Sequence, residues 1–129
     1  MAGLLIQNDH SEPVECLIRN LSIGGAQIRV SATRPVPEPG YLINLKARFA
    51  FHALPVWRLG SLAGLSFDGM HVINDLLPVH LDFLKCHFIE RKLRQADQLI
   101  SEGMQLVAAL RKCDIAEDIY WQNHGLISP

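Results

Sequence analysis

Short apolar runs that alternate with polar residues dominate the chain as far as Phe67, and residues typical of turns separate them. The runs are Gly3–Asn8, Val14–Arg19, Ala26–Val30, Tyr41–Lys46, Ala47–Trp57 and Leu62–Phe67. Alternation with a period of two gives each strand one core-facing side, and short strands with frequent turns are typical of antiparallel sheets. The pattern therefore predicts a six-stranded antiparallel barrel or sandwich and argues against a parallel α/β sheet.

Turn and loop signals between the runs refine this prediction. Asn8–Pro13 has the composition of a turn, which predicts a hairpin between the first two runs. Pro35, Pro37 and Pro39 cannot lie in a central strand, so we expect a loop after the third run. We expect the strand within Ala47–Trp57 to be bent or bulged.

A polar and glycine-rich corner, Arg19-Asn20-Leu21-Ser22-Ile23-Gly24-Gly25-Ala26, joins the second and third runs. Asn20 and Ser22 can bond to the backbone of their own turn, and Gly24 and Gly25 can take positive φ without a Cβ penalty. The corner has two interpretations. It is either an ordinary hairpin turn or a loop whose backbone N–H groups and hydroxyl donors bind an anion.

The pattern changes near Asp75, after which apolar residues recur with the spacing of a helix. Asn74 or Asp75 can cap its start, and Pro78 fits within the first turn. Gly103 costs about 1 kcal/mol relative to Ala inside a helix, so it marks either a break between two helices or a close packing point. We expect an uninterrupted helix from about residue 75 to about Lys112, with a helical pair as the alternative.

This change divides the chain into a β-rich part, residues 1–72, and a helical extension with a tail, residues 73–129. A helix of about 35 residues would run about 50 Å, roughly twice the width of a barrel of this size. Its apolar stripe therefore needs another surface, either a second helix of the same chain or a partner subunit. We expect self-association as a dimer through the helix. The interface residues would be Leu77, Leu81, Leu84, Phe88, Leu99, Leu106 and Leu110.

Charge and cysteine content restrict the classes of partner. The 129 residues include 12 Lys and Arg against 13 Asp and Glu, so no overall field attracts nucleic acid or an anionic membrane. Cys16, Cys86 and Cys113 contain no C-x-x-C pair, which argues against a disulfide framework or a structural zinc site. Met1–Ile6 lacks a basic region and is too short for a signal peptide or a membrane span. We expect a protein of the reducing cytoplasm.

The corner and one later segment resemble a known family. Asn20-x-Ser22-x-x-Gly25 matches the (D/N)-x-S-x-x-G motif of PilZ domains, the small bacterial β-barrels known as cyclic di-GMP receptors. The stretch from Pro55 to Phe67 is similar to the final hairpin of that family, and the two segments together cover roughly residues 3–69. The resemblance implies a PilZ-like barrel in which Asn20, Ser22 and Gly25 are the remnant of a ligand motif.

The chain departs from this family before its first strand. PilZ receptors carry an R-x-x-x-R motif there, and its guanidinium groups grip phosphate oxygens and stack on guanine. Only nineteen residues precede Asn20, and Arg19 is the single Lys or Arg among them. The arginine arm is therefore missing, either because the chain has been shortened at its start or because the domain is atypical.

We therefore expect an atypical PilZ-like protein that acts as a protein–protein interaction module in bacterial signalling and does not bind cyclic di-GMP on its own. The alternative is a cyclic di-GMP receptor that combines Asn20, Ser22 and Gly25 with arginines from elsewhere in the chain or from a second subunit. Arg19 and Arg58 are the candidate cations. A nucleic-acid binder is disfavoured by the neutral charge and the lack of aromatic residues interleaved with basic ones.

The sequence gives little support to other chemistry. It contains no Gly-x-Ser-x-Gly elbow and no paired carboxylates with a distinctive spacing, so we expect no enzymatic activity. His80 and His87 share a helix face but lack a third ligand, so we expect no metal site. Acidic neighbours dilute Arg91, Lys92 and Arg94, which predicts a solvated helix face.

Overall fold

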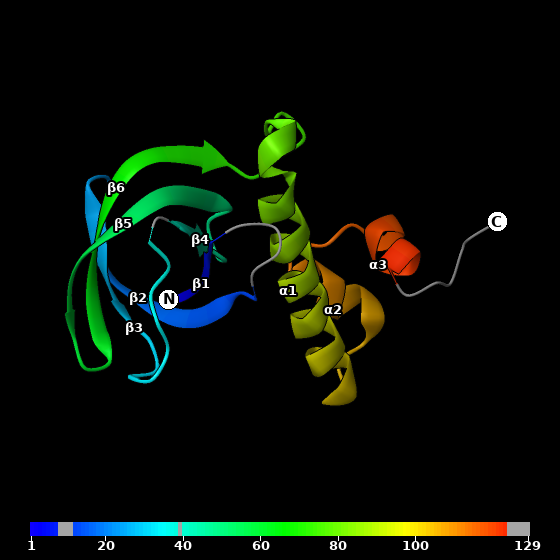
Figure 1. Cartoon of the computed structure of the whole chain (residues 1–129). Coiled ribbons are helices and arrows are strands. Elements are labelled where there is room, and N and C mark those ends of the chain that lie inside the picture. Colours follow the sequence, from blue (N-terminus) through cyan, green and yellow to red (C-terminus); the bar gives the residue numbers. More distant parts are fainter. Residues whose placement is uncertain (8–11, 39, 124–129) are drawn as a thin grey trace. The chain divides into compact units, whose positions relative to one another are not determined.

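The chain forms six strands, and helices follow them (Figure 1). The computed structural model describes residues 1–7, 12–38 and 40–123. The strands are β1 (Ala2–Ile6), β2 (Val14–Ser22), β3 (Gly25–Arg29), β4 (Gly40–Asn44), β5 (Phe49–Leu59) and β6 (Leu62–Val72). Burial alternates along β2 and β3, whereas β1 and β4 are buried along almost their whole length. The helices are a short 3-10 helix (Val79–Leu81), α1 (Asp82–Ser101), α2 (Leu106–Lys112) and α3 (Glu117–Asn123).

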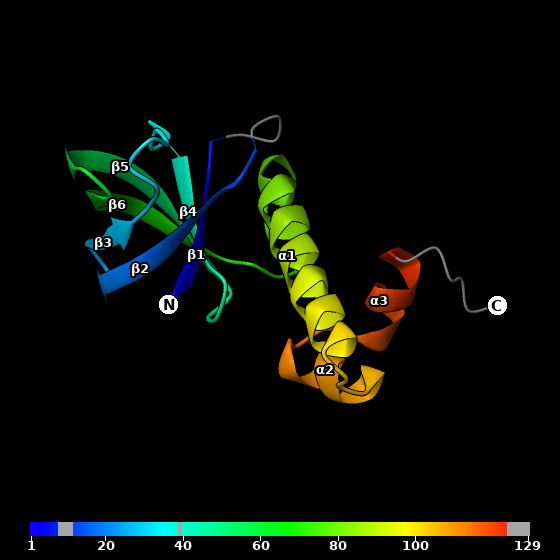
Figure 2. The same cartoon turned by 90° about the horizontal axis from the view of Figure 1, so that it is seen from below.

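The strands close into a barrel because each of them pairs with two antiparallel neighbours, in the order β1-β2-β3-β6-β5-β4. The barrel closes at β1, where Leu4 lies opposite Glu15 of β2 on one side and Ile43 of β4 on the other. Figure 2 shows β1 between these two strands. The prediction of a six-stranded antiparallel barrel followed by helices is confirmed.

One side of every strand faces the inside of the barrel, because residues two apart in a strand share a face. Burying each large apolar side chain contributes about 1.5–3 kcal/mol to the free energy of folding. The buried core of the barrel consists of Leu5, Cys16, Ile18, Ala26, Ile28, Val30, Leu42, Ala53, Ala63 and Leu65. In β2 and β3 the alternation in the sequence therefore identifies the face that points into the barrel.

The pairing of β5 with β6 is irregular at two places, which confirms the expected bulge. Between Phe51 and Ala53 of β5 the register shifts, and the extra residue lies in β6, near Gly69. Between Pro55 and Trp57 the extra residue lies in β5 itself. A proline tolerates this position because a bulge interrupts the ladder of backbone hydrogen bonds.

A loop joins β3 to β4, as the prolines predict, and it contains no strand between Val30 and Glu38. Pro39 lies outside the described residues. The expected turn between the first two strands lies outside them too, except for Glu12 and Pro13.

The chain consists of two compact units, a barrel unit, Met1–Lys85, and a helical unit, Cys86–Pro129. The boundary lies within α1 and therefore later than residue 72, where the change of sequence pattern places it. The first turn of α1 belongs with the barrel because the Phe83 ring meets the Tyr41 ring edge-on, with centroids 5.9 Å apart. Lys85 adds an ion pair with Asp75, at 2.6 Å.

The expected start of the helix near residue 75 is wrong, because α1 begins at Asp82. Asn74 caps a tight turn instead: its side-chain Oδ1 accepts a hydrogen bond from the Leu76 N–H at 2.9 Å. Its backbone oxygen accepts another from the Leu77 N–H at 3.2 Å. Asparagine forms such local bonds readily, and they compete with helical hydrogen bonding.

The expected uninterrupted helix is also wrong, since α1 ends at Ser101. Gly103 has a φ of 102°, in the region that favours glycine. The Gly103 N–H donates to the Ile100 oxygen and the Met104 N–H to the Leu99 oxygen, both at 3.0 Å. These two bonds form a Schellman motif, which ends a helix and satisfies its last carbonyl groups.

Within the helical unit, the short helices α2 and α3 cover the apolar residues at the end of α1. The buried cluster of this unit is Leu93, Ala96, Leu110, Cys113 and Tyr120, with Leu99 and Leu106 among the half-buried residues packed against it. The Tyr120 hydroxyl donates to Asp97 at 3.0 Å and ties α3 to α1. Among the described residues, no helix combines the length and apolar character needed to cross a bilayer.

The seven residues expected at a dimer interface are therefore largely covered within the chain. Leu81, Leu84, Phe88 and Leu110 are buried, and Leu77, Leu99 and Leu106 are half-buried. For Leu99, Leu106 and Leu110 the cover comes from a second helix of the same chain, which is the first of the two alternatives. The dimer was expected because the apolar stripe of the helix would lack cover within the chain, and the structure removes that reason.

Candidate functional site

The Asn20–Gly25 corner is a tight hairpin between β2 and β3. Ser22 pairs with Gly25, so Ile23 and Gly24 form the turn. The Ser22 hydroxyl donates a hydrogen bond to the Gly25 backbone oxygen at 3.2 Å, across the mouth of the turn. The serine of the motif therefore stabilises its own hairpin, as short hydroxyl side chains commonly do in turns.

A bulge lies directly before this turn. Arg19 pairs with Gln27, so β2 carries one more residue than β3 between this pair and the turn. Asn20 takes up the extra residue with a φ of 50°, a left-handed conformation that asparagine tolerates better than most residues. Its Nδ2 donates to Gln27 Oε1 at 3.0 Å. The asparagine of the motif thus forms the bulge and uses its side-chain amide for a hydrogen bond to the neighbouring strand.

Gly24 and Gly25 do not use the positive φ that glycine permits, whereas Asn20 of the same hairpin does. Gly25 is required for another reason: a Cβ there would overlap the backbone oxygen of Leu65 on β6. A Cβ at Gly24 would meet nothing within 4 Å. Of the two glycines, only Gly25 permits the close approach of a neighbouring strand.

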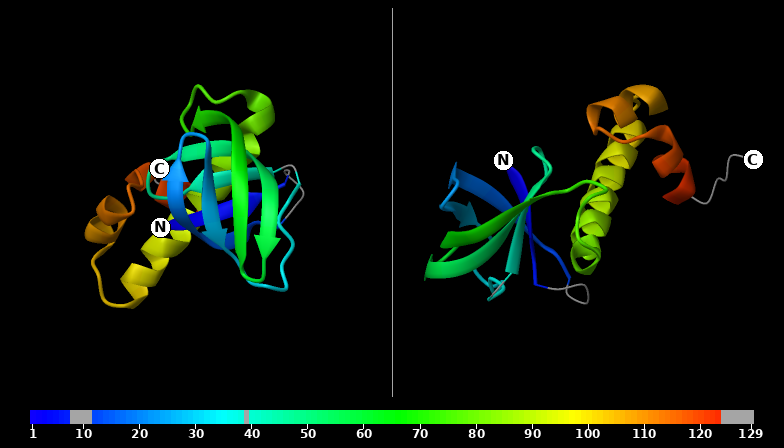
Figure 3. Two further views of the ribbon diagram at one scale, coloured as in Figure 1. Left: turned by 90° about the vertical axis from the view of Figure 1, so that its left-hand side faces the viewer. Right: turned by 90° about the horizontal axis from the view of Figure 1, so that it is seen from above.

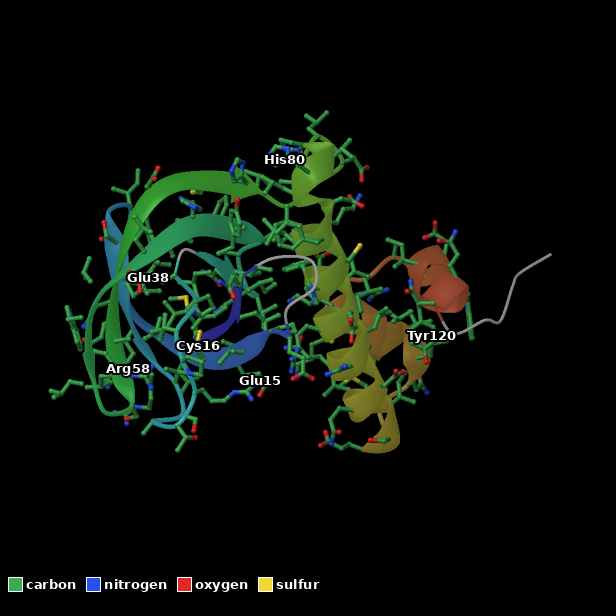
Figure 4. The ribbon with its side chains drawn as sticks, in the orientation of Figure 1. Glu15, Cys16, Glu38, Arg58, His80 and Tyr120 are labelled. Atoms are coloured by element: carbon green, nitrogen blue, oxygen red, sulfur yellow. The ribbon has the colours of Figure 1, made fainter. Side chains whose placement is uncertain are left out.

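Arg58, one of the two candidate cations, is engaged in holding the barrel loops (Figure 4). Its guanidinium donates to three backbone oxygens, those of Gly60 at 2.7 Å, Ser31 at 2.9 Å and Arg34 at 3.0 Å. These bonds tie the loop after β3 to the β5–β6 hairpin. An arginine that already donates to three backbone oxygens has fewer N–H groups left to bind a phosphate.

Arg19, the other candidate cation, is exposed on β2 beside the corner. Within the part of the chain that the structure describes, its side chain makes no hydrogen bond or ion pair. Arg29, one strand away, donates from Nη1 to the Ser61 hydroxyl at 3.2 Å. The structure therefore places one unengaged guanidinium, and not a pair of them, next to the motif.

The register of the barrel aligns Arg19 with residues that the sequence analysis did not connect to it. Arg19 pairs with Gln27, Gln27 with Gly64, and Gly64 with Trp57, so the four form one row across β2, β3, β6 and β5. The left panel of Figure 3 looks onto these four strands, which lie side by side. The indole lies on the backbone of Gly64, where a Cβ would overlap the Trp57 ring.

A second row runs beside the first and consists of Leu17, Arg29, Leu62 and Leu59. Leu17, Arg19, Gln27 and Arg29 point out of the barrel, because adjacent residues in β2 and β3 face its core, and Trp57 and Leu59 of β5 are exposed. We call the surface formed by Leu17, Arg19, Gln27, Arg29, Trp57 and Leu59 the outer face. Its three apolar members are exposed by 53% for Leu17, 45% for Trp57 and 73% for Leu59.

The His, Cys, Asp and Glu side chains of the described residues form no cluster that could hold a metal ion. No group of three or more His, Cys, Asp or Glu side chains gathers within residues 1–7, 12–38 and 40–123. Burial raises the pKa of the Cys16 thiol to about 12 and also raises the pKa of the Cys113 thiol. A thiol with a raised pKa is a poor nucleophile at neutral pH.

Comparisons of this chain with protein families, with curated proteins and with solved structures find no match. The geometry of the corner and of the outer face is therefore the basis for a functional proposal.

Proposed function

We propose that the chain is an atypical PilZ-like protein of bacterial signalling, which acts as a protein–protein interaction module and does not bind cyclic di-GMP on its own. One observation carries the proposal: the polar groups of the motif serve the barrel itself. Asn20 and Ser22 donate within the β2–β3 hairpin, and Arg58 donates to three backbone oxygens. Enzymatic activity and a bound cofactor form no part of the proposal.

Energetics support the loss of nucleotide binding. Cyclic di-GMP carries two phosphates, and a hydrogen bond to a charged group contributes about 1.5–3 kcal/mol when well made. The absence of two arginine anchors then costs on the order of 3–6 kcal/mol, which moves a micromolar site to the millimolar range or weaker. Arg19 alone does not replace two anchors.

Titration calorimetry tests this part of the proposal. Cyclic di-GMP at tens of micromolar should give no heat beyond that of dilution, and cyclic di-AMP serves as the control for non-specific binding. Micromolar affinity for cyclic di-GMP that Asn20→Ala or Ser22→Ala abolishes would overturn the proposal.

A cyclic di-GMP receptor is the second candidate, and the position of Arg19 favours it. Arg19 and the exposed Trp57 are the two ends of one row, with Gln27 and Gly64 between them, and arginine and an aromatic ring on one surface can bind a phosphate and a base. The receptor would need further arginines from a second subunit. Binding that Arg19→Ala abolishes while Arg34→Ala preserves it would support this candidate.

Two further elements of the proposal concern compartment and assembly. The free cysteines Cys16, Cys86 and Cys113 fit a reducing compartment, so we place the protein in the cytoplasm. Self-association through the helices stays a prediction. Val107 of α2, exposed by 56%, is an apolar residue of the helical unit that a dimer could still cover. Light scattering on the wild type and on Val107→Asp tests it, because only a dimer built on this surface would dissociate.

A further inference from the structure

We propose that the outer face is the docking site for an acidic segment of a partner protein, anchored by leucine or aromatic side chains. The inference rests on the proposed function as an interaction module and names the surface and the class of partner. It starts from the two rows of residues that cross β2, β3, β6 and β5.

The outer face presents three large apolar side chains to solvent. Leu59 and Leu17 stand at the two ends of one row, and Trp57 lies beside Leu59 in the next row. All three side chains are exposed although each is large and apolar. Single exposed apolar residues are normal on a protein, but a group of them on one face marks an interaction site.

Trp57 is suited to be the centre of such a site. Its ring rests on the backbone of Gly64, where no side chain can displace it, so the indole is fixed before a partner arrives. A fixed aromatic side chain loses little conformational entropy on binding. Tryptophan and arginine are also the residues most enriched among those that dominate binding energy at interfaces.

The charge of the outer face selects an acidic partner. Arg19 and Arg29 lie among the apolar residues, and Arg29 keeps donors besides the Nη1 that bonds to Ser61. The two rows contain no acidic side chain. The nearest acids on these strands are already engaged: Glu15 has an interaction of its own, and Asp68 faces His52 at 3.4 Å. Complementary charges across an interface accelerate association and exclude partners of the wrong sign.

The same charges argue against two other occupants. In a symmetric dimer the same patch meets itself, so the arginines of both copies would share one interface to which the two rows contribute no acid. An anionic membrane surface is generally recognised by clusters of about 4–8 Lys and Arg, more than these rows supply. An acidic protein segment fits both the apolar and the cationic groups.

Phage display with random peptides tests the proposal on the full chain. We expect enrichment of peptides that combine Asp or Glu with Leu, Trp or Phe. A selected peptide is then synthesised with a fluorescent label, together with a control peptide in which Lys replaces each acid. Fluorescence anisotropy measures the affinity of both for the wild type and for three variants.

Leu59→Ser and Arg19→Glu alter exposed residues of the outer face, and each should weaken binding of the acidic peptide by about tenfold or more. Leu76→Ser is the matched control, because Leu76 is an exposed leucine of the barrel unit outside the outer face. It should leave the affinity unchanged. The control peptide should not bind the wild type.

Three outcomes would overturn the inference. Enrichment of basic peptides, or of none, would refute an acidic partner. Equal affinity of the acidic peptide for the wild type, Leu59→Ser and Arg19→Glu would refute the surface but leave the interaction module in place. Sedimentation of the chain with vesicles of phosphatidylcholine and phosphatidylglycerol would assign the face to a membrane. Micromolar binding of cyclic di-GMP is a separate result, and it would refute the proposed function as an interaction module.

Discussion

At the scale of single residues, two adjacent glycines of the β2–β3 hairpin have different surroundings. Substituting each of them tests whether β6 leaves room for a Cβ at that position. Gly25→Ala should destabilise the barrel by about 1–3 kcal/mol, because the new Cβ overlaps the Leu65 oxygen on β6. Gly24→Ala should cost less than about 1 kcal/mol, since its Cβ meets nothing within 4 Å. Thermal unfolding of both variants measures the difference, and equal melting temperatures would refute the close approach of β6 to Gly25.

Cys16 predicts a pH dependence of stability. The thiol is buried in the barrel (Figure 4), and burial raises its pKa to about 12. The thiol of an unfolded chain has a pKa of about 8.5, so the pKa in the folded state lies above that in the unfolded state. The stabilisation by the neutral thiol is therefore complete below about pH 8.5 and is lost as the pH rises towards the folded pKa.

Urea unfolding of the wild type and Cys16→Ala at neutral and alkaline pH tests this dependence. The stability advantage of the wild type should shrink by roughly 2 kcal/mol between about pH 8.5 and pH 10, because one proton is worth about 1.4 kcal/mol per pH unit. Other groups titrate alike in both proteins. An advantage that stays constant over this range would show that the thiol is not buried.

At the scale of elements, Arg58 is the connection between two loops that are distant in the sequence. Arg58→Ala should free the loop after β3, because it removes the donors to Ser31 and Arg34. We expect faster amide hydrogen exchange at Arg34, whose N–H donates to the Ser31 oxygen at 3.0 Å. Arg19→Ala is the matched control on an exposed arginine, and equal exchange rates in the two variants would contradict the role of Arg58.

Strands β2 and β3 were predictable because their alternation with a period of two matches their burial, whereas the ends of the helices were not predictable. Asn74 and Gly103 each favour a local structure by about 1 kcal/mol, which is too little to decide between a helix and a turn from sequence alone. The outer face was not predictable either. Its rows depend on the bulges at Asn20 and after Pro55, and a slip of one residue would turn Trp57 inward.

The motif itself illustrates the same limit. The sequence identified Asn20, Ser22 and Gly25 as a corner, which the structure confirms as a hairpin. It did not indicate Gln27 as the acceptor for Asn20, because that contact crosses two strands. A glycine opposite a tryptophan in a hairpin, here Gly64 and Trp57, was the available signal for the rest of the outer face.

At the scale of the whole molecule, the barrel unit and the helical unit have separate cores. Leu99→Asp should lower the helical signal in circular dichroism, because Leu99 packs against the cluster of the helical unit. A charge placed there costs several kcal/mol unless it is paired. Amide signals of β1 to β6 in NMR spectra should persist. Loss of both sets of signals together would contradict two separate cores.

The central claim is that the Asn20–Gly25 corner is a structural hairpin of an interaction module and not a nucleotide site. A titration of the labelled chain with cyclic di-GMP, followed by NMR chemical shifts of the backbone amides, tests it most directly. We expect the amides of Asn20, Ser22, Gly25 and Gln27 to keep their positions up to a slight molar excess of nucleotide at submillimolar concentration. Saturable shifts of these amides at micromolar nucleotide would contradict the claim and identify the protein as a receptor.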